Sequence, residues 1–381
     1  MFLERLLSCL STSDPHPASL IRSHLLPNFY SYIWSFKNPV SGSSPRFVSE
    51  KSILECLKVW YFGTDPLESG ITICLVISLV TWLLGEFTGD LSQVQVDRLW
   101  TILPVLYSAH FVILSPKLDD RMRLLLMCHI IWSIRLTTNT FRRGFFELKE
   151  DYRWKIVKRK FSKWQLKLLN VIFVSLFQNI LLFSTSLPQY LLLTTKLYPS
   201  RDAKNSNLNW IDFSLLVCFI VVLAIETIAD EQQQTYQIAK RKNDHQRFFA
   251  SALKRGFVTN GLWYYSRHPN VACEQLIWYI LYGFTIVATR SSNQLCFSDL
   301  INYTLASPIL MSILLYSSTV FTESISSSKY PTYAQYQKTT DMFWLPLTII
   351  RRMILKLILN NKKYDQLLEN VFSLELELKD E

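Results

Sequence analysis

The stretch IDFSLLVCFIVVLAIETIA, residues 211–229, decides the fold class of this 381-residue chain. Its only charged side chains are Asp212 and Glu226, and its length approaches the ~20 apolar residues that a helix needs to cross the hydrocarbon of a bilayer. A second run of similar quality covers 166–187, and weaker runs lie at about 71–88, 99–115, 121–136, 271–289 and 302–321. The sequence therefore predicts an all-α fold: a polytopic membrane helix bundle with about seven transmembrane helices, within a range of roughly six to ten.

The composition of the whole chain agrees with partial burial in lipid. Hydrophobic residues make up 49% and charged residues 18%, and the chain has only 9 glycines. An average protein has about 25% charged residues and about 7% glycine. The scarcity of glycine argues against the Rossmann and P-loop nucleotide-binding folds, because both need glycine where backbone amides approach phosphate. Neither G-x-G-x-x-G nor G-x-x-x-x-G-K-[ST] occurs in the sequence.

The 7 cysteines are scattered without a C-x-x-C pair, and several lie inside apolar runs. This pattern is typical of small buried hydrophobic residues and predicts neither a disulfide framework nor a metal site. The first apolar stretch is short and is broken by Asp14, Pro15 and Pro17, which does not fit a signal peptide. We therefore expect insertion into the membrane to depend on the internal runs.

Lysine and arginine are concentrated in two of the connections between apolar runs. The connections 142–163 and 240–267 are strongly basic, whereas 291–301 has no basic residue. Because cytoplasmic loops carry an excess of Lys and Arg, the two basic loops and the C-terminus are predicted in the cytosol and the N-terminus on the opposite side. Nucleic-acid binding is the rival explanation of the net charge of +10. We predict no nucleic-acid partner, because the basic residues flank spanning segments instead of forming a separate domain.

The sequence divides into three regions. Residues 1–70 contain a linker-like stretch at 41–45 between aromatic segments and are predicted to be a membrane-associated region. Residues 71–346 hold the transmembrane domain, and residues 347–381 hold a C-terminal amphipathic helix and tail. Basic and apolar faces alternate at helical spacing over 347–359, which suits a helix on an anionic leaflet. Packing of this helix against the rest of the protein is an equal alternative.

Polar side chains gather at the run ends that this topology places on the cytosolic side. Glu226 and Asp230 stand four residues apart, as do Asn270 and Glu274, so each pair projects from one helix face. Ionisable groups at the rim of a membrane bundle are costly and are usually placed by function. The alternative interpretation is that Glu226 and Asp230 simply end a helix at the membrane interface. We expect a polar cup open to the cytosol, formed by Asp97, Arg98, Arg135, Asn139, Glu226, Asp230, Asn270, Glu274 and Glu323.

The segment Arg267-His268-Pro269 has the features of an anion site. Proline suits the first turn of a helix, where its missing amide is harmless. Arg267 and His268 then lie just outside a helix N-terminus, and such an arrangement suits a phosphate. An ordinary turn before a proline-started helix is the alternative interpretation.

These motifs resemble those of a known family. The stretch GLWYYSRHPN, residues 261–270, followed by Glu274, resembles the signature of membrane proteins similar to the C-terminal domain of steroid 5-alpha-reductases. The surrounding motifs resemble those of the subgroup known as DUF1295, and the likeness spans roughly residues 95–346. They are Asp97–Trp100, Arg135–Asn139, Glu150–Trp154, Ala229–Gln232 and Thr322–Pro331. Val271 and Cys273 depart from the usual Tyr and Gly of the family, which concerns the substrate side of the pocket more than the coenzyme side.

The resemblance implies a multi-pass protein of the endoplasmic reticulum membrane that uses NADPH. The implied reaction is hydride transfer to a carbon–carbon double bond of a lipid or sterol-like enone, with the bilayer and that lipid as partners. The cofactor-binding candidates are Arg135, Asn139, Asp230, Arg267, His268, Asn270 and Glu274. The candidates for the proton donor are Glu274, Tyr265 and Glu323, with no choice among them.

Two other functions stay open at this point. Isoprenylcysteine carboxyl methyltransferases share this architecture and a similar R-H-P element, with S-adenosylmethionine as the cofactor. They usually carry paired glutamates before the last motif, whereas this chain has Thr322-Glu323. A non-catalytic, lipid-binding membrane protein is the second alternative. The sequence predicts neither the identity of the substrate nor the oligomeric state.

Overall fold

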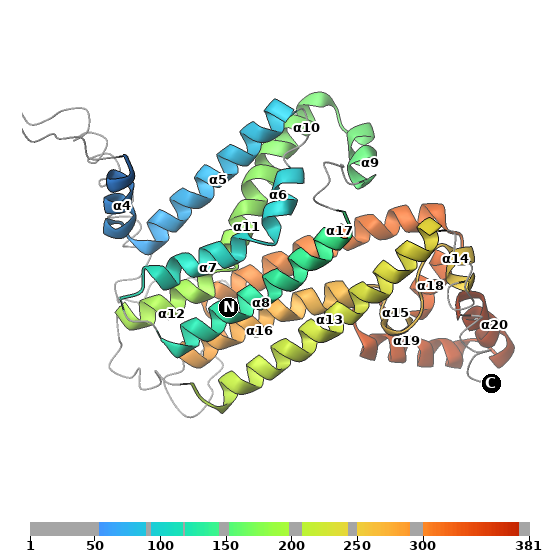
Figure 1. Ribbon diagram of the computed structural model, residues 1–381. Helices are drawn as coiled ribbons and strands as arrows, with labels where there is room; N and C mark the ends of the chain where they lie inside the picture. Colours follow the sequence, from blue (N-terminus) through green and yellow to red (C-terminus); the bar gives the residue numbers. More distant parts are fainter. Residues whose placement is uncertain are drawn as a thin grey trace, which may run out of the picture. The chain divides into compact units, whose positions relative to one another are not determined.

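The computed structural model describes residues 53–88, 93–116, 119–144, 152–197, 208–242, 250–289 and 300–372. All of the regular elements in these ranges are helices, which confirms the predicted all-α class (Figure 1). The chain divides into two compact units, 1–73 and 74–381. Of the region predicted at 1–70, residues 1–52 lie outside the described residues, and α4 (Ile53–Gly63) follows them.

Five helices within the described ranges are long and apolar enough to cross a membrane. This agrees with a polytopic helical bundle, and these five correspond to five of the seven predicted runs. They are α5 (Pro66–Thr88), the continuous series α10 (Lys163–Leu169), η1 (Asn170–Phe177) and α11 (Gln178–Ser184), α13 (Trp210–Lys242), α16 (Pro269–Thr289), and η3 (Tyr303–Leu305) with α17 (Ala306–Lys329).

The other two runs also form helices, but with different properties. The run at 99–115 divides between α6 (Gln93–Trp100) and α7 (Leu103–Ile113), because Pro104 starts a new helix in its first turn. At 11 residues α7 is about 16 Å long, well short of the ~30 Å hydrocarbon thickness. The run at 121–136 lies within α8 (Asp120–Arg142), which is 23 residues long but carries several polar side chains. Two of these, Arg121 and His129, are buried inside the protein.

Helices α8 and α13 run parallel in a fixed register. Arg121 pairs with Asp212, Arg135 pairs with Glu226, and Asn139 contacts Asp230, and in each case the partners are 91 residues apart. A constant separation means that both chains advance in the same direction. Arg121 donates to both carboxylate oxygens of Asp212 at 2.8 Å, and both side chains are fully buried. This ion pair fixes one end of the two-helix register.

Helix α16 runs antiparallel to α13 on another side, and Figure 1 shows α8, α13 and α16 side by side. Asn270 at the start of α16 contacts Asp230, whereas Gly283 near its end lies against Leu215 at the start of α13. A Cβ atom at Gly283 would approach the Leu215 Cδ2 atom to 2.9 Å, so a larger residue there would force the Leu215 side chain to shift. The pairing brings the polar start of α16 to the polar second half of α13.

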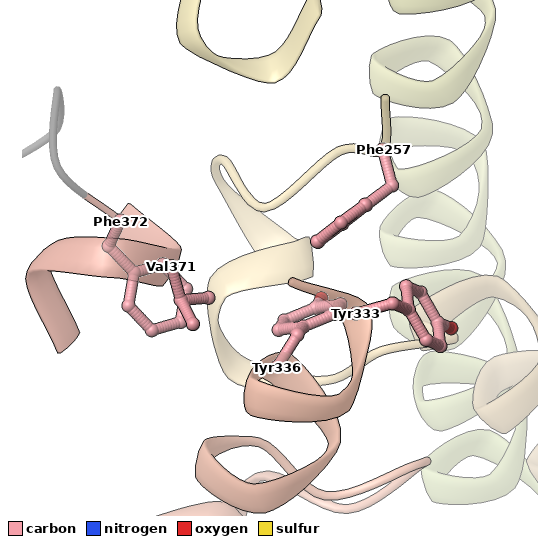
Figure 2. Close-up of a cluster of buried hydrophobic side chains, with 5 residues drawn as sticks. All are labelled: Phe257, Tyr333, Tyr336, Val371 and Phe372. Atoms are coloured by element: carbon pink, nitrogen blue, oxygen red, sulfur yellow. The ribbon is translucent and has the colours of Figure 1, made fainter. Parts of the chain in front are cut away.

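The C-terminal helices pack on the loop between α13 and α16. Here lie α14 (Ala250–Arg255), α15 (Leu262–Tyr265), α18 (Tyr333–Thr339), α19 (Leu345–Ile358) and α20 (Asn361–Phe372). Figure 2 shows the buried cluster that joins α18 and α20 to this loop, in which Phe257 stacks on Tyr336 with ring centroids 5.4 Å apart. The remaining helices are α9 (Tyr152–Lys160) and α12 (Leu187–Leu197).

The predicted amphipathic helix at 347–359 is present as α19. One face packs on the protein, where Arg352 lies over the ring of Tyr264 at 4.0 Å and donates to the Tyr264 carbonyl at 2.7 Å. The opposite face is apolar and open, with Leu357 85% and Ile358 73% exposed. The helix therefore both packs on the protein and presents an apolar surface suited to a membrane.

Candidate functional site

Asp230 is the centre of a polar cluster that joins three parts of the chain. Its carboxylate accepts hydrogen bonds from Asn139 at 2.7 Å, Arg143 at 2.9 Å and Asn270 at 3.0 Å, and from Arg135. Asp230 is 5% exposed. Four donors around one buried carboxylate compensate its desolvation, so the cluster is a stable, preorganised feature of this end of the bundle.

A second layer of carboxyl groups lies one helical turn deeper. Arg135 also donates to Glu226 at 2.7 Å, so a single guanidinium bridges the i and i+4 carboxylates of α13. On α16, Glu274 accepts hydrogen bonds from the indole nitrogens of Trp132 and Trp278, each at 3.0 Å. These carboxyl groups line a cavity of about 270 Å³. Apolar side chains complete its wall, among them Trp100, Leu136, Val271 and Leu315.

Arg267, His268 and Glu323 form a separate cluster. Arg267 donates to the two carboxylate oxygens of Glu323 at 2.6 and 3.0 Å, and His268 Nε2 lies 2.9 Å from the same carboxylate. The remaining Arg267 contacts include the carbonyls of Gln337, at 3.2 Å, and Thr340. Arg267 is 6% exposed. This guanidinium therefore ties the start of α16 to α17 and α18.

A larger cavity of about 590 Å³ adjoins the first one. Arg143, Arg153, Asn270 and Val271 line both cavities, so the N-terminus of α16 forms their shared wall. Much of the rest of the larger cavity consists of basic and aromatic side chains from α13, the 256–263 segment, the end of α17 and the start of α18. They are Tyr236, Lys240, Phe257, Trp263, Lys329, Tyr330 and Tyr333, with His268 beside them.

Tyr330 and Lys240 form a polar contact at the rim of the larger cavity. Lys240 Nζ donates to the Tyr330 hydroxyl at 3.0 Å and to the Gly256 carbonyl at 3.2 Å. Burial by itself raises the pKa of Tyr330, but the hydrogen bonds and charges of Lys240 and Lys329 outweigh it and lower the pKa below its ordinary value. Gly256 has φ +91° and lies directly against the Tyr330 ring.

The structure brings most of the candidate residues together, but in two groups. Arg135, Asn139, Asp230 and Asn270 meet at one cluster, with Glu274 beside it in the wall of the smaller cavity. The second group consists of Arg267, His268 and Glu323. Tyr265 belongs to neither group: it is 47% exposed and lines neither cavity. Of the motif Glu150–Trp154, Glu150 and Asp151 lie outside the described residues.

Several residues of the two cavities were missing from the sequence-based candidates. Arg143 and Lys240 were interpreted only as part of the basic loops that set the topology, and Arg153 only as part of those loops and of a family motif, yet all three line the larger cavity. Trp132 and Trp278 were not singled out, although their indoles hold Glu274. The sequence did contain a signal for Arg143. It follows Asn139 by four residues and so lies on the same helix face.

Fold and site together define a multi-pass helical membrane protein with a buried polar site between its helices. The chain belongs to the DUF1295 family: the family model, described as a protein of unknown function, matches residues 81–340. The chain is similar to the uncharacterized protein C594.04c of Schizosaccharomyces pombe, with 31% identity over 297 residues, covering 75% of this chain and 81% of that protein. No solved structure matches the chain.

Proposed function

We propose that the protein is a membrane reductase that uses NADPH and acts on a carbon–carbon double bond of a lipid or sterol-like enone. The observation that carries the proposal is the pair of adjoining cavities at the start of α16. The larger is lined by basic and aromatic side chains, and the smaller by carboxyl groups, arginines and apolar side chains. The first set suits a phosphorylated coenzyme, and the second suits an apolar substrate that must receive a proton.

The residues of the larger cavity fit a dinucleotide. Its volume of about 590 Å³ is within the ~300–1,000 Å³ of small-molecule sites. Arg143, Arg153 and Lys240 offer positive charge near a helix N-terminus, which is the usual setting for phosphate. Asn270 adds an unpaired acceptor, since its Oδ1 atom is buried without a hydrogen-bond partner in the described part of the chain. This oxygen is suited to a carboxamide or ribose donor.

The chain's own residues then have distinct roles. NADPH, when bound, supplies the hydride for the double bond. Asp230 holds Arg143 and Asn270 in place at the shared wall. Arg267, with its donors directed at Glu323 and two carbonyls, acts on the coenzyme by positioning His268 and the start of α16. The smaller cavity, at about 270 Å³, takes the reacting end of the lipid while its tail remains in the bilayer.

The same proposal includes a cellular location. Arg143, Arg153 and Lys240 of the larger cavity belong to the two connections that the positive-inside rule assigns to the cytosol. We propose that these loops and the C-terminus face the cytosol from the endoplasmic reticulum membrane, where cytosolic NADPH has direct access. The division into a membrane-associated region 1–70, a reductase-like domain 71–346 and a C-terminal region 347–381 belongs to this proposal.

A ligand-stability experiment tests the coenzyme. The purified protein in detergent should melt at a higher temperature with NADPH than without it, because a ligand that binds only the folded state adds ~2.7 kcal/mol at 100 times its Kd. S-adenosylmethionine should have no effect. Protection by S-adenosylmethionine alone would contradict the proposal and favour the methyltransferase.

A pair of neighbouring variants tests the site. Lys240→Ala should raise the NADPH Kd about tenfold or more, because a hydrogen bond to a charged group contributes ~1.5–3 kcal/mol. Lys242→Ala removes an equal charge from the exposed end of the same helix and lines neither cavity, so it should change the Kd less than about twofold. Equal effects of the two variants would mean that only net charge matters.

A comparison of lipids tests the substrate class. Deletion of the protein should make an unsaturated enone lipid accumulate and its saturated product decrease in an untargeted lipid analysis. Unchanged sterol, enoyl-lipid and prenyl profiles would instead favour the non-catalytic lipid-binding function.

A further inference from the structure

Glu226 is a buried carboxyl group with one oxygen that no donor reaches. The side chain lies in the wall of the smaller cavity and is 3% exposed. Its Oε1 atom accepts the hydrogen bond from Arg135 at 2.7 Å, whereas its Oε2 atom is buried and takes no hydrogen bond from any donor in the described ranges. A buried carboxylate oxygen without a donor is costly. The ion pair with Arg135 therefore does not explain how the buried Oε2 atom is stabilised.

Its neighbour on α16 is a second carboxyl group, that of Glu274, which interacts directly with Glu226. Both oxygens of Glu274 are acceptors, because each takes an indole N–H at 3.0 Å and an indole nitrogen can only donate. Two such hydrogen bonds stabilise the negative charge of Glu274. The structure thus places the Glu274 carboxyl group, whose two oxygens both accept hydrogen bonds, in the same cavity wall as a carboxyl oxygen that lacks a donor.

A charge on one of two neighbouring buried carboxyl groups makes a charge on the other unfavourable, and the protons they hold belong to the pair. The groups that face Glu226 are Arg135 from α8, Asp230 from α13, and Glu274 and Cys273 from α16, with Asp97 of α6 in the same cavity wall. Arg135 is shared between Glu226 and Asp230, and Arg143 also pairs with Asp230, so these two arginines offset two of the three negative charges that Glu226, Asp230 and Glu274 would carry. A proton on Glu226 Oε2 removes one negative charge and gives this oxygen a hydrogen that it can donate to Glu274.

We propose that Glu226 and Glu274 share one proton, held on Glu226, and that Glu226 is the acid that protonates the lipid substrate. The inference rests on the proposed reductase function. When the double bond is reduced, the substrate becomes an enolate. The O–H bond of Glu226 breaks as the enolate electron pair forms the new C–H bond. The carboxylate left on Glu226 takes a proton from water that enters the cavity, so each turnover consumes one proton and one reduced coenzyme.

The other acidic candidates do not meet these requirements. Tyr265 lines neither cavity. Glu323 accepts hydrogen bonds from Arg267, Tyr333 and Gln337, so its oxygens are occupied by donors. Glu274 keeps a positioning role, since its charge holds the proton of Glu226 in place.

Infrared spectroscopy of the full protein in detergent tests where the proton is. At neutral pH the native protein should show a carboxylic acid C=O band that shifts in deuterium oxide, and Glu226→Gln should lose it. The same variant should keep the native melting temperature, because glutamine replaces a neutral acid with a group of equal shape. Glu274→Gln should melt several degrees lower, because it removes the charge that two indoles stabilise. Glu231→Gln, an exposed residue of the same helix, is the control for both measurements.

Turnover gives the catalytic test. With cholest-4-en-3-one or hexadec-2-enal as the probe, Glu226→Gln should reduce the rate about 100-fold or more while NADPH still binds. Loss of the infrared band in Glu274→Gln instead, or its absence from the native protein, would overturn the inference. An unchanged rate in Glu226→Gln would do the same. Failure of NADPH to bind the native protein would contradict the proposed function itself, whatever the infrared result.

Discussion

At the scale of single residues, Asp230 and its neighbour Glu231 carry the same charge but differ in burial and in the number of hydrogen-bond partners. Asp230 is buried and accepts hydrogen bonds from four side chains, including Arg135 and Arg143. Glu231 forms an exposed ion pair with Arg142 at 2.6 Å, in which both side chains are about half exposed. Adjacent residues on one helix thus give a matched comparison of a buried and an exposed charge.

We expect Asp230→Asn to destabilise the protein by about 3 kcal/mol, because it removes the buried negative charge that Arg135 shares with Glu226 and that Arg143 also contacts. Glu231→Gln should cost less than about 1 kcal/mol. Unfolding curves in detergent, followed by the loss of helical circular dichroism, measure both. Similar losses for the two variants would show that the Asp230 cluster is not a stability element.

The sequence predicted which residue types form the site but not how they pair. Asp230 and Asn270 were expected to lie in one cup, and they are in contact. Arg267 was expected to bind phosphate, and in the structure its donors are directed to Glu323 and to backbone carbonyls. Those carbonyls belong to residues 337 and 340, and no side-chain pattern marks a carbonyl as an acceptor. The phosphate contact of Arg267 stays a prediction.

At the scale of elements, the turn after α14 depends on one glycine. Gly256 has φ +91°, and a Cβ atom there would lie 2.1 Å from the Tyr330 Cε1 atom. Both facts exclude a side chain, since L-residues rarely adopt such a φ and the ring occupies the space. The glycine therefore allows the Tyr330 ring to lie against the backbone, within reach of Lys240.

Gly256→Ala should destabilise the protein by about 1–3 kcal/mol through strain and overpacking. It should also separate Tyr330 from Lys240 and so raise the pKa of Tyr330 toward its ordinary value. The lowered pKa means that the folded state favours the Tyr330 phenolate. This preference adds stability only as the pH rises through the lowered pKa of Tyr330, and Gly256→Ala should lose that added stability.

An ultraviolet pH titration, taken as the difference from Tyr330→Phe, measures the pKa. Gly63→Ala is the control, because a Cβ atom at Gly63 has nothing within 4 Å. A titration curve unchanged by Gly256→Ala would show that the glycine does not set the contact.

The elements also show why two of the seven apolar runs do not form long apolar helices. Five runs were identified correctly as long apolar helices. The run at 99–115 was broken by Pro104, and its apolar character comes from burial of α7 inside the protein, with Leu103 and Phe111 fully buried. Periodicity cannot separate a short buried helix from part of a span. Helix α8 shows the opposite mismatch: it is long enough to cross a membrane, but it carries polar residues that pair with partners on α13.

At the scale of the whole molecule, the all-α class followed from composition and run length, whereas the register did not. The parallel arrangement of α8 with α13 rests on ion pairs between residues 91 positions apart. Nothing in a single sequence pairs a given arginine with a given carboxylate at that distance. The sequence likewise did not predict which residues hold the C-terminal helices on the 256–263 segment, because the cluster joins aromatic residues far apart in the chain.

The cluster in Figure 2 joins α20 to the rest of the unit, and Phe372 is its outermost aromatic member. Its ring lies 4.6 Å from that of Tyr264 and 5.0 Å from the Arg352 guanidinium. Phe372→Ala removes a buried ring, a change that costs ~3–5 kcal/mol in a packed core. We expect faster amide hydrogen exchange in α18 and α20 and unchanged exchange in α13 and α16.

Exchange followed by mass spectrometry measures the effect of this change. Leu357→Ala on α19 is the control, because that side chain is 85% exposed and should leave the exchange rates unchanged. Faster exchange throughout the molecule in Phe372→Ala would show that the C-terminal helices are required for the whole fold.

The length of α13 has a last consequence. Its 33 residues extend about 50 Å, more than the ~30 Å of hydrocarbon in a bilayer. Lys240 follows Glu226 by 14 positions, about 21 Å along the axis and close to four full turns, so the two side chains point the same way. A single added residue between them would rotate one against the other by about 100°. Evolution can lengthen or shorten this stretch only in steps of three or four residues if charge recognition and proton supply are to stay in phase.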